Sequence, residues 1–121
     1  MGETKKPGTV FLDIDGTLIE HRGSHFLQIM RQPIVLSETR ARLEEWDRAG
    51  WRIVLVTGRR ESSRAHTEAQ LLREGIFYDQ LVMGMGNGPR VLINDQKPDG
   101  EVTAFAFCPP RNEGLKDVVL P

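Results

Sequence analysis

The sequence has little of several features that define other classes of protein. Its 121 residues include one cysteine, Cys108, which excludes an internal disulfide and a thiolate-rich zinc site. No run of about 18 consecutive apolar residues is present, so no membrane span is predicted. The first residues, MGETKKPG, lack the apolar core of a secretory signal. We therefore expect a soluble, cytoplasmic protein.

An excess of charge of one sign is also missing. The 16 basic and 17 acidic residues give a formal net charge of -1, which argues against a nucleic-acid partner because nucleic-acid-binding domains are usually basic. Lysine is scarce, and Lys97 is the only lysine away from the chain ends. Four of the seven aspartates lie in two short clusters, Asp13 with Asp15 and Asp95 with Asp99.

The order of apolar segments is that of a small α/β protein. We expect a polar tail over residues 1–8 and a single domain over 9–121. Helices are predicted over 38–49, with Ser37 as the cap, and over 61–74, while 17–35 is predicted to be a loop or small hairpin. Strands are predicted at 9–14, 51–56, 80–83, 91–93 and 102–107. This alternation predicts a mostly parallel sheet of about five strands.

Polar residues follow three of these strands. Asp13 and Asp15 are two residues apart, so on an extended backbone their side chains point to the same side. Thr57 and Asp95 close two other strands, and ligands gather at the carboxyl ends of parallel strands. Paired carboxylates bind a divalent cation or share the work of nucleophile and general acid. Because Asp13 follows an apolar run, we expect it to be largely buried and to need a metal or charged partner.

Three segments in sequence order resemble the motifs of the haloacid dehalogenase (HAD) superfamily of phosphohydrolases. FLDIDGTL, residues 11–18, is similar to the first motif, and IVLVTGR, residues 53–59, is similar to the second. VLINDQKPD, residues 91–99, is similar to the fourth. The resemblance spans roughly residues 9–107, and it implies a three-layer, Rossmann-like (HAD-like) fold.

The same resemblance implies a phosphatase mechanism. Asp13 would be the nucleophile that forms an aspartyl-phosphate, and Asp15 would act as general acid and then as general base. The Thr57 hydroxyl and the Gly58 amide would bind the phosphate.

A magnesium ion is also implied. The Asp13 carboxylate, the Asp15 backbone carbonyl and Asp95 would hold Mg²⁺, and Asp99 would be a further ligand or support the others. Asn94 stands where the family usually has Gly or Asp, and its side chain is uncharged. Asp95 and Asp99 are therefore the residues that supply the carboxylates of this motif.

The basic phosphate-binding residue of the family is not at its usual place upstream of the fourth motif. Lys97 and Arg90 are the two candidates, and we favour Lys97 because it is the only interior lysine. Arg59 is a candidate substrate contact, with a solvated helix start as the alternative. His21 and His25 are also candidate substrate contacts; their spacing would suit a metal only on a helix, and Gly23 argues against a helix there.

No room is left for a cap domain. About 20 residues separate Asp15 from Ser37, and fewer than ten separate Met83 from Val91. Family members without a cap act on larger substrates or close the site with a neighbouring subunit, which leaves a homo-oligomer open. The prediction is a Mg²⁺-dependent phosphomonoesterase acting on a sugar phosphate or similar small metabolite. A non-catalytic phosphate-binding module and a phosphotransferase are the alternatives.

Overall fold

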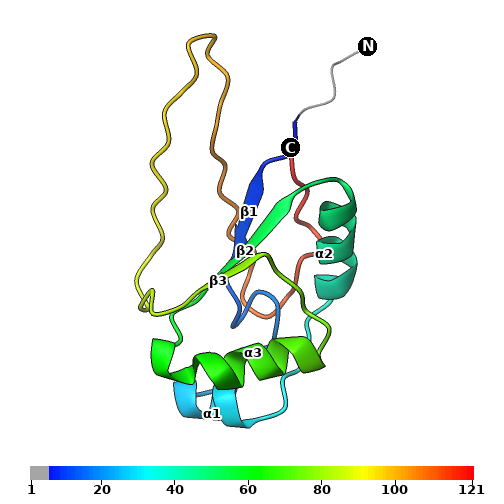
Figure 1. Cartoon of the computed structure of the whole chain (residues 1–121), viewed down its shortest axis with the longest axis vertical. Helices are drawn as coiled ribbons and strands as arrows, with labels where there is room; N and C mark the ends of the chain where they lie inside the picture. Colours follow the sequence, from blue (N-terminus) through cyan, green and yellow to red (C-terminus); the bar gives the residue numbers. More distant parts are fainter. Residues whose placement is uncertain (1–5) are drawn as a thin grey trace.

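Three short parallel strands form the centre of the fold (Figure 1). The computed structural model describes residues 6–121, so most of the predicted tail over 1–8 lies outside the described residues. The sheet order is β1-β2-β3, and both strand pairs are parallel. In chain order the elements are β1 (Thr9–Leu12), α1 (His25–Met30), α2 (Thr39–Arg48), β2 (Arg52–Val56), the 3-10 turn η1 (Glu61–Ser63), α3 (Arg64–Arg73) and β3 (Gln80–Val82).

One face of the sheet carries the core. Leu12, Leu55 and Leu81 are aligned across the three strands, and all three are buried. Leu43 and Trp46 of α2 belong to the same apolar cluster. The chain crosses from β1 to β2 through α2, and from β2 to β3 through α3. Successive right-handed crossovers in one direction place their helices on the same side of a sheet.

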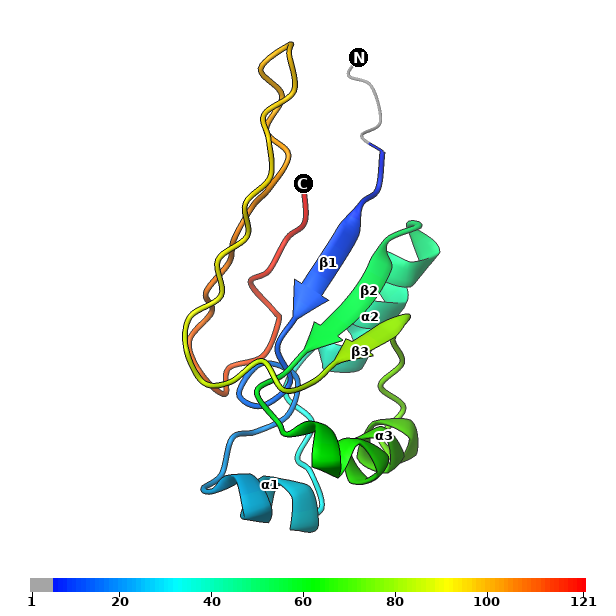
Figure 2. The same cartoon turned by 60° about the vertical axis from the view of Figure 1, so that its left-hand side comes forward.

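The opposite face of the sheet is partly open to solvent. Phe11, Val54 and Gln80 are aligned on this face; Phe11 on the edge strand is 54% exposed, whereas Val54 on the central strand is buried at 6%. Val82, two residues beyond Gln80, is 37% exposed. Figure 2 shows α2 behind the strands in a view onto this open face. The described chain is an α/β fold with a parallel sheet, which is consistent with the Rossmann-like fold that the resemblance implied.

The predicted strands at 91–93 and 102–107 are wrong. Both segments belong to an extended excursion of the chain, residues 89–109, which we call the arm, and neither pairs with the sheet. The arm turns back at its far end, where the Gly100 amide donates to the Lys97 carbonyl at 2.8 Å. That end stands clear of the rest of the chain in Figures 1 and 2. An apolar run becomes a strand only where a sheet edge lies beside it, so the sheet described here has three strands instead of five.

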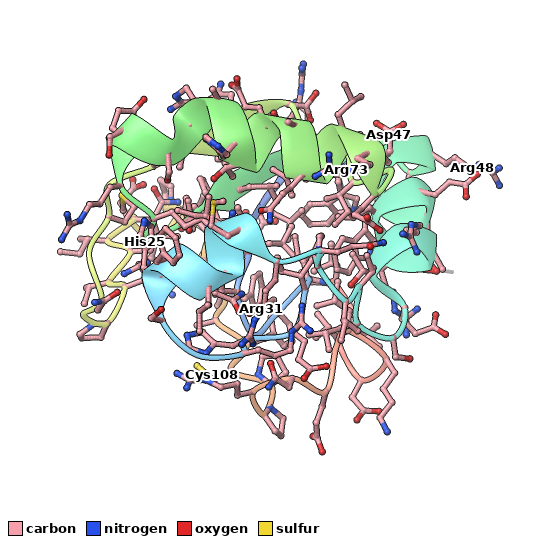
Figure 3. All side chains as sticks on the ribbon, turned by 90° about the horizontal axis from the view of Figure 1, so that it is seen from below. His25, Arg31, Asp47, Arg48, Arg73 and Cys108 are labelled. Atoms are coloured by element: carbon pink, nitrogen blue, oxygen red, sulfur yellow. The ribbon has the colours of Figure 1, made fainter. Side chains whose placement is uncertain are left out.

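The predicted helices are found, with one addition and one correction. The 38–49 helix is α2, but its N-cap is Glu38 in a left-handed conformation (φ 67°), not Ser37. The 61–74 helix is divided into η1 and α3. The segment expected to be irregular contains α1, which begins where Ser24 accepts a hydrogen bond from the Leu27 amide. Figures 1 and 3 show α1 and α3 side by side beyond the carboxyl ends of the strands.

Candidate functional site

Asp13 and Asp15 lie at the carboxyl end of β1. Asp13 directly follows the strand, and one of its carboxylate oxygens accepts a hydrogen bond from the Ile14 amide at 2.9 Å. The residue is solvent-exposed, which corrects the expectation that it would be largely buried. Neighbouring protein atoms still displace part of its hydration, and this partial burial raises the pKa of Asp13, while the Ile14 hydrogen bond and the charge of Arg90 oppose the rise.

Asp15 is in a different environment, because Arg59 forms a bidentate ion pair with it. Arg59 Nε donates to Asp15 Oδ2 at 2.9 Å, and Nη2 donates to Oδ1 at 2.8 Å. Gln28 Nε2 also donates to Oδ1, at 2.6 Å. Burial alone would raise the pKa of Asp15, but the hydrogen bonds and charge of Arg59, with the Gln28 hydrogen bond, lower it below its usual value. The two neighbouring carboxyl groups therefore have pKa values shifted in opposite directions.

A closed chain of hydrogen bonds supports this ion pair. Arg59 Nη1 donates to Gln70 Oε1 at 2.7 Å and to Thr67 Oγ1 at 3.1 Å, both on α3. Gln70 Nε2 in turn lies within 3.0–3.1 Å of the carbonyls of Gln28, Ile29 and Arg31 near the end of α1. The network thus joins the first motif, the second motif and α1 through buried polar groups that all find partners.

This network corrects the sequence prediction for Arg59 and contains two residues, Gln28 and Gln70, that the sequence did not indicate. The guanidinium of Arg59 is buried, and its donors are taken by Asp15 and by the two side chains on α3. The structure therefore places Arg59 as the partner of Asp15 and not as a substrate contact. Gln28 and Gln70 were missed in the sequence. A glutamine in a polar or amphipathic segment gives no signal that distinguishes a buried network position from a solvated one.

Thr57 and Gly58 follow β2 at the same edge of the sheet. Thr57 is buried, and its hydroxyl oxygen accepts a hydrogen bond from the Arg59 amide at 3.1 Å. A Cβ atom added to Gly58 would lie 2.5 Å from the Gly86 carbonyl oxygen, so only glycine fits there. The Met85 amide donates to the Thr57 carbonyl at 3.0 Å, which fixes the 84–88 loop against the turn after β2.

The structure brings Arg90, and not Lys97, to this site. Arg90 Nη1 donates to the carbonyls of Gly86 and Gly88, and its positive charge is among the influences that lower the pKa of Asp13. Lys97 lies at the turn of the arm and pairs with Glu101 at 3.2 Å. The preference for Lys97 is therefore corrected in favour of Arg90.

Asp95 and Asp99 are also on the arm. The Asp95 carbonyl accepts a hydrogen bond from the Thr103 hydroxyl, and Asp99 Oδ1 accepts one from the Glu101 amide, as in a turn. Among residues 6–121, no group of three or more His, Cys, Asp or Glu side chains is arranged to hold a metal ion. The expected four-aspartate cluster is not assembled, because the segment carrying two of its members is not a strand of the sheet.

The two candidate histidines differ in position. His21 lies close enough to Asp13 and Asp15 for its charge to lower the pKa of both, and its backbone is hydrogen-bonded to the Asn112 side chain. His25 is exposed at the start of α1 (Figure 3). Arg111, which the sequence analysis did not single out, lies against Gly16, because an added Cβ there would be 3.2 Å from its Cγ.

Comparison with known proteins gives a structural likeness only. No protein-family model and no curated protein matches the chain. A solved structure of the Pnkp1/Rnl/Hen1 complex matches with a TM-score of 0.58 and 28% identity, covering 74% of this chain and 32% of the other. A second structure, of the Pnkp1/Rnl/Hen1 RNA repair complex, matches with a TM-score of 0.56 and 29% identity, covering 64% and 25%. This chain thus spans about a third or less of the chains it resembles.

These matches bear on two expectations. The fold is that of an α/β protein with a parallel sheet, similar to part of a chain in an RNA repair complex. The HAD resemblance itself still depends on the sequence motifs. The expectation of a small-metabolite partner, with nucleic acid argued against, is wrong, because both matched structures are of an RNA repair complex.

None of the helices in residues 6–121 combines the length and the apolar character that a membrane crossing requires.

Proposed function

We propose that this chain is a phosphatase that removes a terminal phosphate from RNA. The observation that carries the proposal is the pair of carboxylates after β1, in which Asp13 is exposed and Asp15 is held by Arg59. Asp13 is therefore open to an incoming phosphate, while Arg59 and Gln28 fix the direction of the Asp15 carboxyl group beside it. The RNA substrate is supported by the likeness to chains of an RNA repair complex, since repair acts on strand ends.

The reaction has two steps. In the first, a carboxylate oxygen of Asp13 attacks phosphorus, the bond from phosphorus to the ribose oxygen breaks, and Asp15 gives its proton to that oxygen. In the second, water attacks the aspartyl-phosphate while Asp15 accepts a proton from the water. The bond from phosphorus to Asp13 then breaks, and inorganic phosphate leaves.

The environment of Asp15 affects the two steps differently. Arg59 and Gln28 fix the direction of its carboxyl group, and Arg59 favours the ionised form. That form is the proton acceptor of the second step. The first step needs a proton on Asp15 against the charge of Arg59, so we expect it to limit the rate as the pH rises.

Three groups around Asp13 are suited to binding phosphate oxygens. The Thr57 hydroxyl and the Gly58 amide follow β2 at the same edge of the sheet, and each is a hydrogen-bond donor. Arg90 supplies the positive charge near Asp13. Arg111 beside Gly16 extends the basic side of the site.

Magnesium is part of the proposal, with a smaller ligand set than the motifs implied. Mg²⁺ commonly takes one or two protein carboxylates and completes its shell with water and phosphate oxygens. Asp13 fits this role, because only one of its carboxylate oxygens accepts a hydrogen bond from the described residues. The Asp13 carboxylate and the Asp15 carbonyl would hold the ion, which when bound reduces the repulsion between carboxylate and phosphate.

The test is phosphate release from short RNA oligonucleotides that carry a 3′- or a 5′-terminal phosphate, with and without Mg²⁺. Asp13→Asn is expected to lower the rate by roughly 10³-fold or more. Asp47→Asn is the matched control, because Asp47 is exposed on α2 and is expected to leave the rate unchanged. No release from either oligonucleotide by the unmodified chain, or full activity of Asp13→Asn, would overturn the proposal.

A phosphate-binding module without turnover is the second candidate. The absence of a three-ligand acidic group among residues 6–121 favours it. Binding of the phosphorylated oligonucleotide with no phosphate release in Mg²⁺ would support this candidate over the phosphatase.

A further inference from the structure

The arm carries an apolar surface that no other part of residues 6–121 covers. Between Pro89 and Pro109 every residue is exposed except Thr103 and Ala104, which are half-buried. Ile93 is 89% exposed, and Phe105 is 53% exposed. The large apolar side chains exposed on the arm are Val91, Leu92, Ile93, Val102, Phe105 and Phe107.

The backbone of the arm is also without partners over most of its length. Within residues 6–121, the backbone hydrogen bonds between its two legs are confined to the turn, where the Lys97 amide donates to the Glu101 carbonyl at 3.3 Å and the Gly100 amide donates to the Lys97 carbonyl at 2.8 Å. A lone two-stranded ribbon is marginal in water, so this arm needs a partner surface.

The same chain has an open surface of the matching kind. On the open sheet face, Phe11 of the edge strand β1 and Val82 of the edge strand β3 are exposed. The arm does not cover this face in its own molecule, because it runs to the side of β1 and does not cross the strands in the view of Figure 2.

We infer that the arm of one copy packs on the open sheet face of a second copy, and that the exchange is reciprocal. Each chain carries both surfaces, so two copies related by a two-fold axis satisfy both arms at once. Side chains alternate along an extended leg, so one face covers about half of the six apolar side chains of the arm, roughly 350 Å². In a reciprocal exchange each copy also buries its own sheet face, which brings the area per partner toward the ~800 Å² of a standard interface.

The charges on the arm favour a protein partner over RNA. Residues 89–109 contain two basic and three acidic side chains, and the acidic ones are Asp95, Asp99 and Glu101 near the turn. An acidic end repels the phosphate backbone of nucleic acid. The legs themselves carry Arg90 as their only charge outside residues 95–101, which suits burial against an apolar face.

The first experiment measures molar mass by light scattering and sedimentation over a wide range of concentrations. We expect the chain to have twice its single-chain mass of 13.7 kDa. Ile93→Asp combined with Phe105→Asp, and separately Phe11→Asp, are expected to give monomers. Leu72→Asp is the matched control, because Leu72 is an 83% exposed apolar residue on α3 and its change should leave the dimer intact.

A mixing experiment distinguishes arm exchange from contact between two arms. Phe11→Asp keeps an intact arm, and the Ile93→Asp, Phe105→Asp double variant keeps an intact face. Mixed together, they should form a mixed dimer through one arm-to-face contact, although each is a monomer alone. If Phe11→Asp alone remains a dimer, the proposed contact with the sheet face is wrong.

Hydrogen exchange of the unmodified chain tests the proposal without any substitution. The amides of residues 91–107 should exchange slowly in concentrated protein and quickly on dilution below the dissociation constant. A chain that is monomeric at every concentration, with fast exchange throughout the arm, would overturn the inference. Because neither readout involves phosphate release, the outcome is independent of the proposed phosphatase activity.

Discussion

Arg59 and Asp15 form an ion pair with two parallel hydrogen bonds of 2.9 and 2.8 Å, and the Arg59 side chain is only 2% exposed. The pair joins the turn after β2 to the loop after β1. It thus connects the two sequence motifs that carry the proposed chemistry.

Breaking this pair should strongly destabilise the chain. Arg59→Met leaves the largely buried Asp15 carboxylate without its main partner, which typically costs about 3–5 kcal/mol. The matched control is Arg48→Met, because Arg48 pairs with Glu44 at the surface, where an ion pair contributes about 0–1 kcal/mol. The free energies of unfolding in urea at pH 7 provide the measurement. Similar small losses for both variants would contradict the assignment.

The pH dependence of Asp15→Asn follows from the direction of its pKa shift. Because the pKa of Asp15 in the fold is below its usual value of 3.8, its ionised form stabilises the fold above that pH. The stabilisation disappears as the pH falls through the lowered pKa. We therefore expect Asp15→Asn to be less stable than the unmodified chain at pH 7, with the difference shrinking below pH 3.8 in urea titrations. A constant difference from pH 7 to pH 2 would contradict the argument.

Asp13→Asn should behave in the opposite way. The raised pKa of Asp13 means that the fold prefers its protonated form, so its favourable contribution is present below pH 3.8 and is lost as the pH rises through the higher value. Asparagine cannot ionise and can still accept the Ile14 hydrogen bond. Because Asp13 is exposed, we expect a gain below about 1 kcal/mol at pH 7 without Mg²⁺. Thermal unfolding at pH 7 and pH 3 measures it, and a loss of stability at pH 7 would refute the prediction.

Gln28→Leu tests whether α1 positions Asp15 for proton transfer. The substitution removes the 2.6 Å hydrogen bond to Asp15 Oδ1 while Arg59 remains. If Asp15 protonates the leaving oxygen, the rate should fall more for an alkyl phosphate, whose leaving group needs the proton, than for an aryl phosphate. We expect the ratio of the two kcat values to change by about 10-fold or more. An equal loss on both substrates would indicate a purely structural role for Gln28.

Gly58→Ala tests the close approach between the turn after β2 and the 84–88 loop. The new methyl group would lie 2.5 Å from the Gly86 carbonyl oxygen, so the loop must shift. We expect a loss of about 1–3 kcal/mol in stability and weaker phosphate binding. Gly88→Ala is the matched control, because an added Cβ there meets nothing within 4 Å. Equal effects of the two alanines on the unfolding free energy and on the KM for RNA phosphate would contradict this prediction.

Much of the sheet and its edge could be predicted locally. The apolar runs at β1, β2 and β3 predicted the strands, and the helices between them predicted that the strands are parallel. The position of Asp13 and Thr57 at strand ends followed directly from those runs.

The segment from Val91 to Phe107 shows where local pattern fails. Its residues have the composition of strands, yet a strand also needs a neighbouring edge, which is a property of the whole chain. In this structure the chain has no such neighbour for them, so Asp95, Asp99 and Lys97 lie on the arm instead of at the site.

The sequence by itself determined the parallel α/β core and the juxtaposition of Asp13, Asp15 and Thr57, because side-chain periodicity and strand ends are local properties. Only the tertiary structure decided the partners of those side chains. Arg59 turns inward because Gln70 and Thr67 on α3 satisfy the donors that Asp15 leaves free, and Arg90 replaces Lys97 because the arm carries the lysine away. Contacts between segments distant in the chain depend on how the elements pack, and no local pattern encodes that packing.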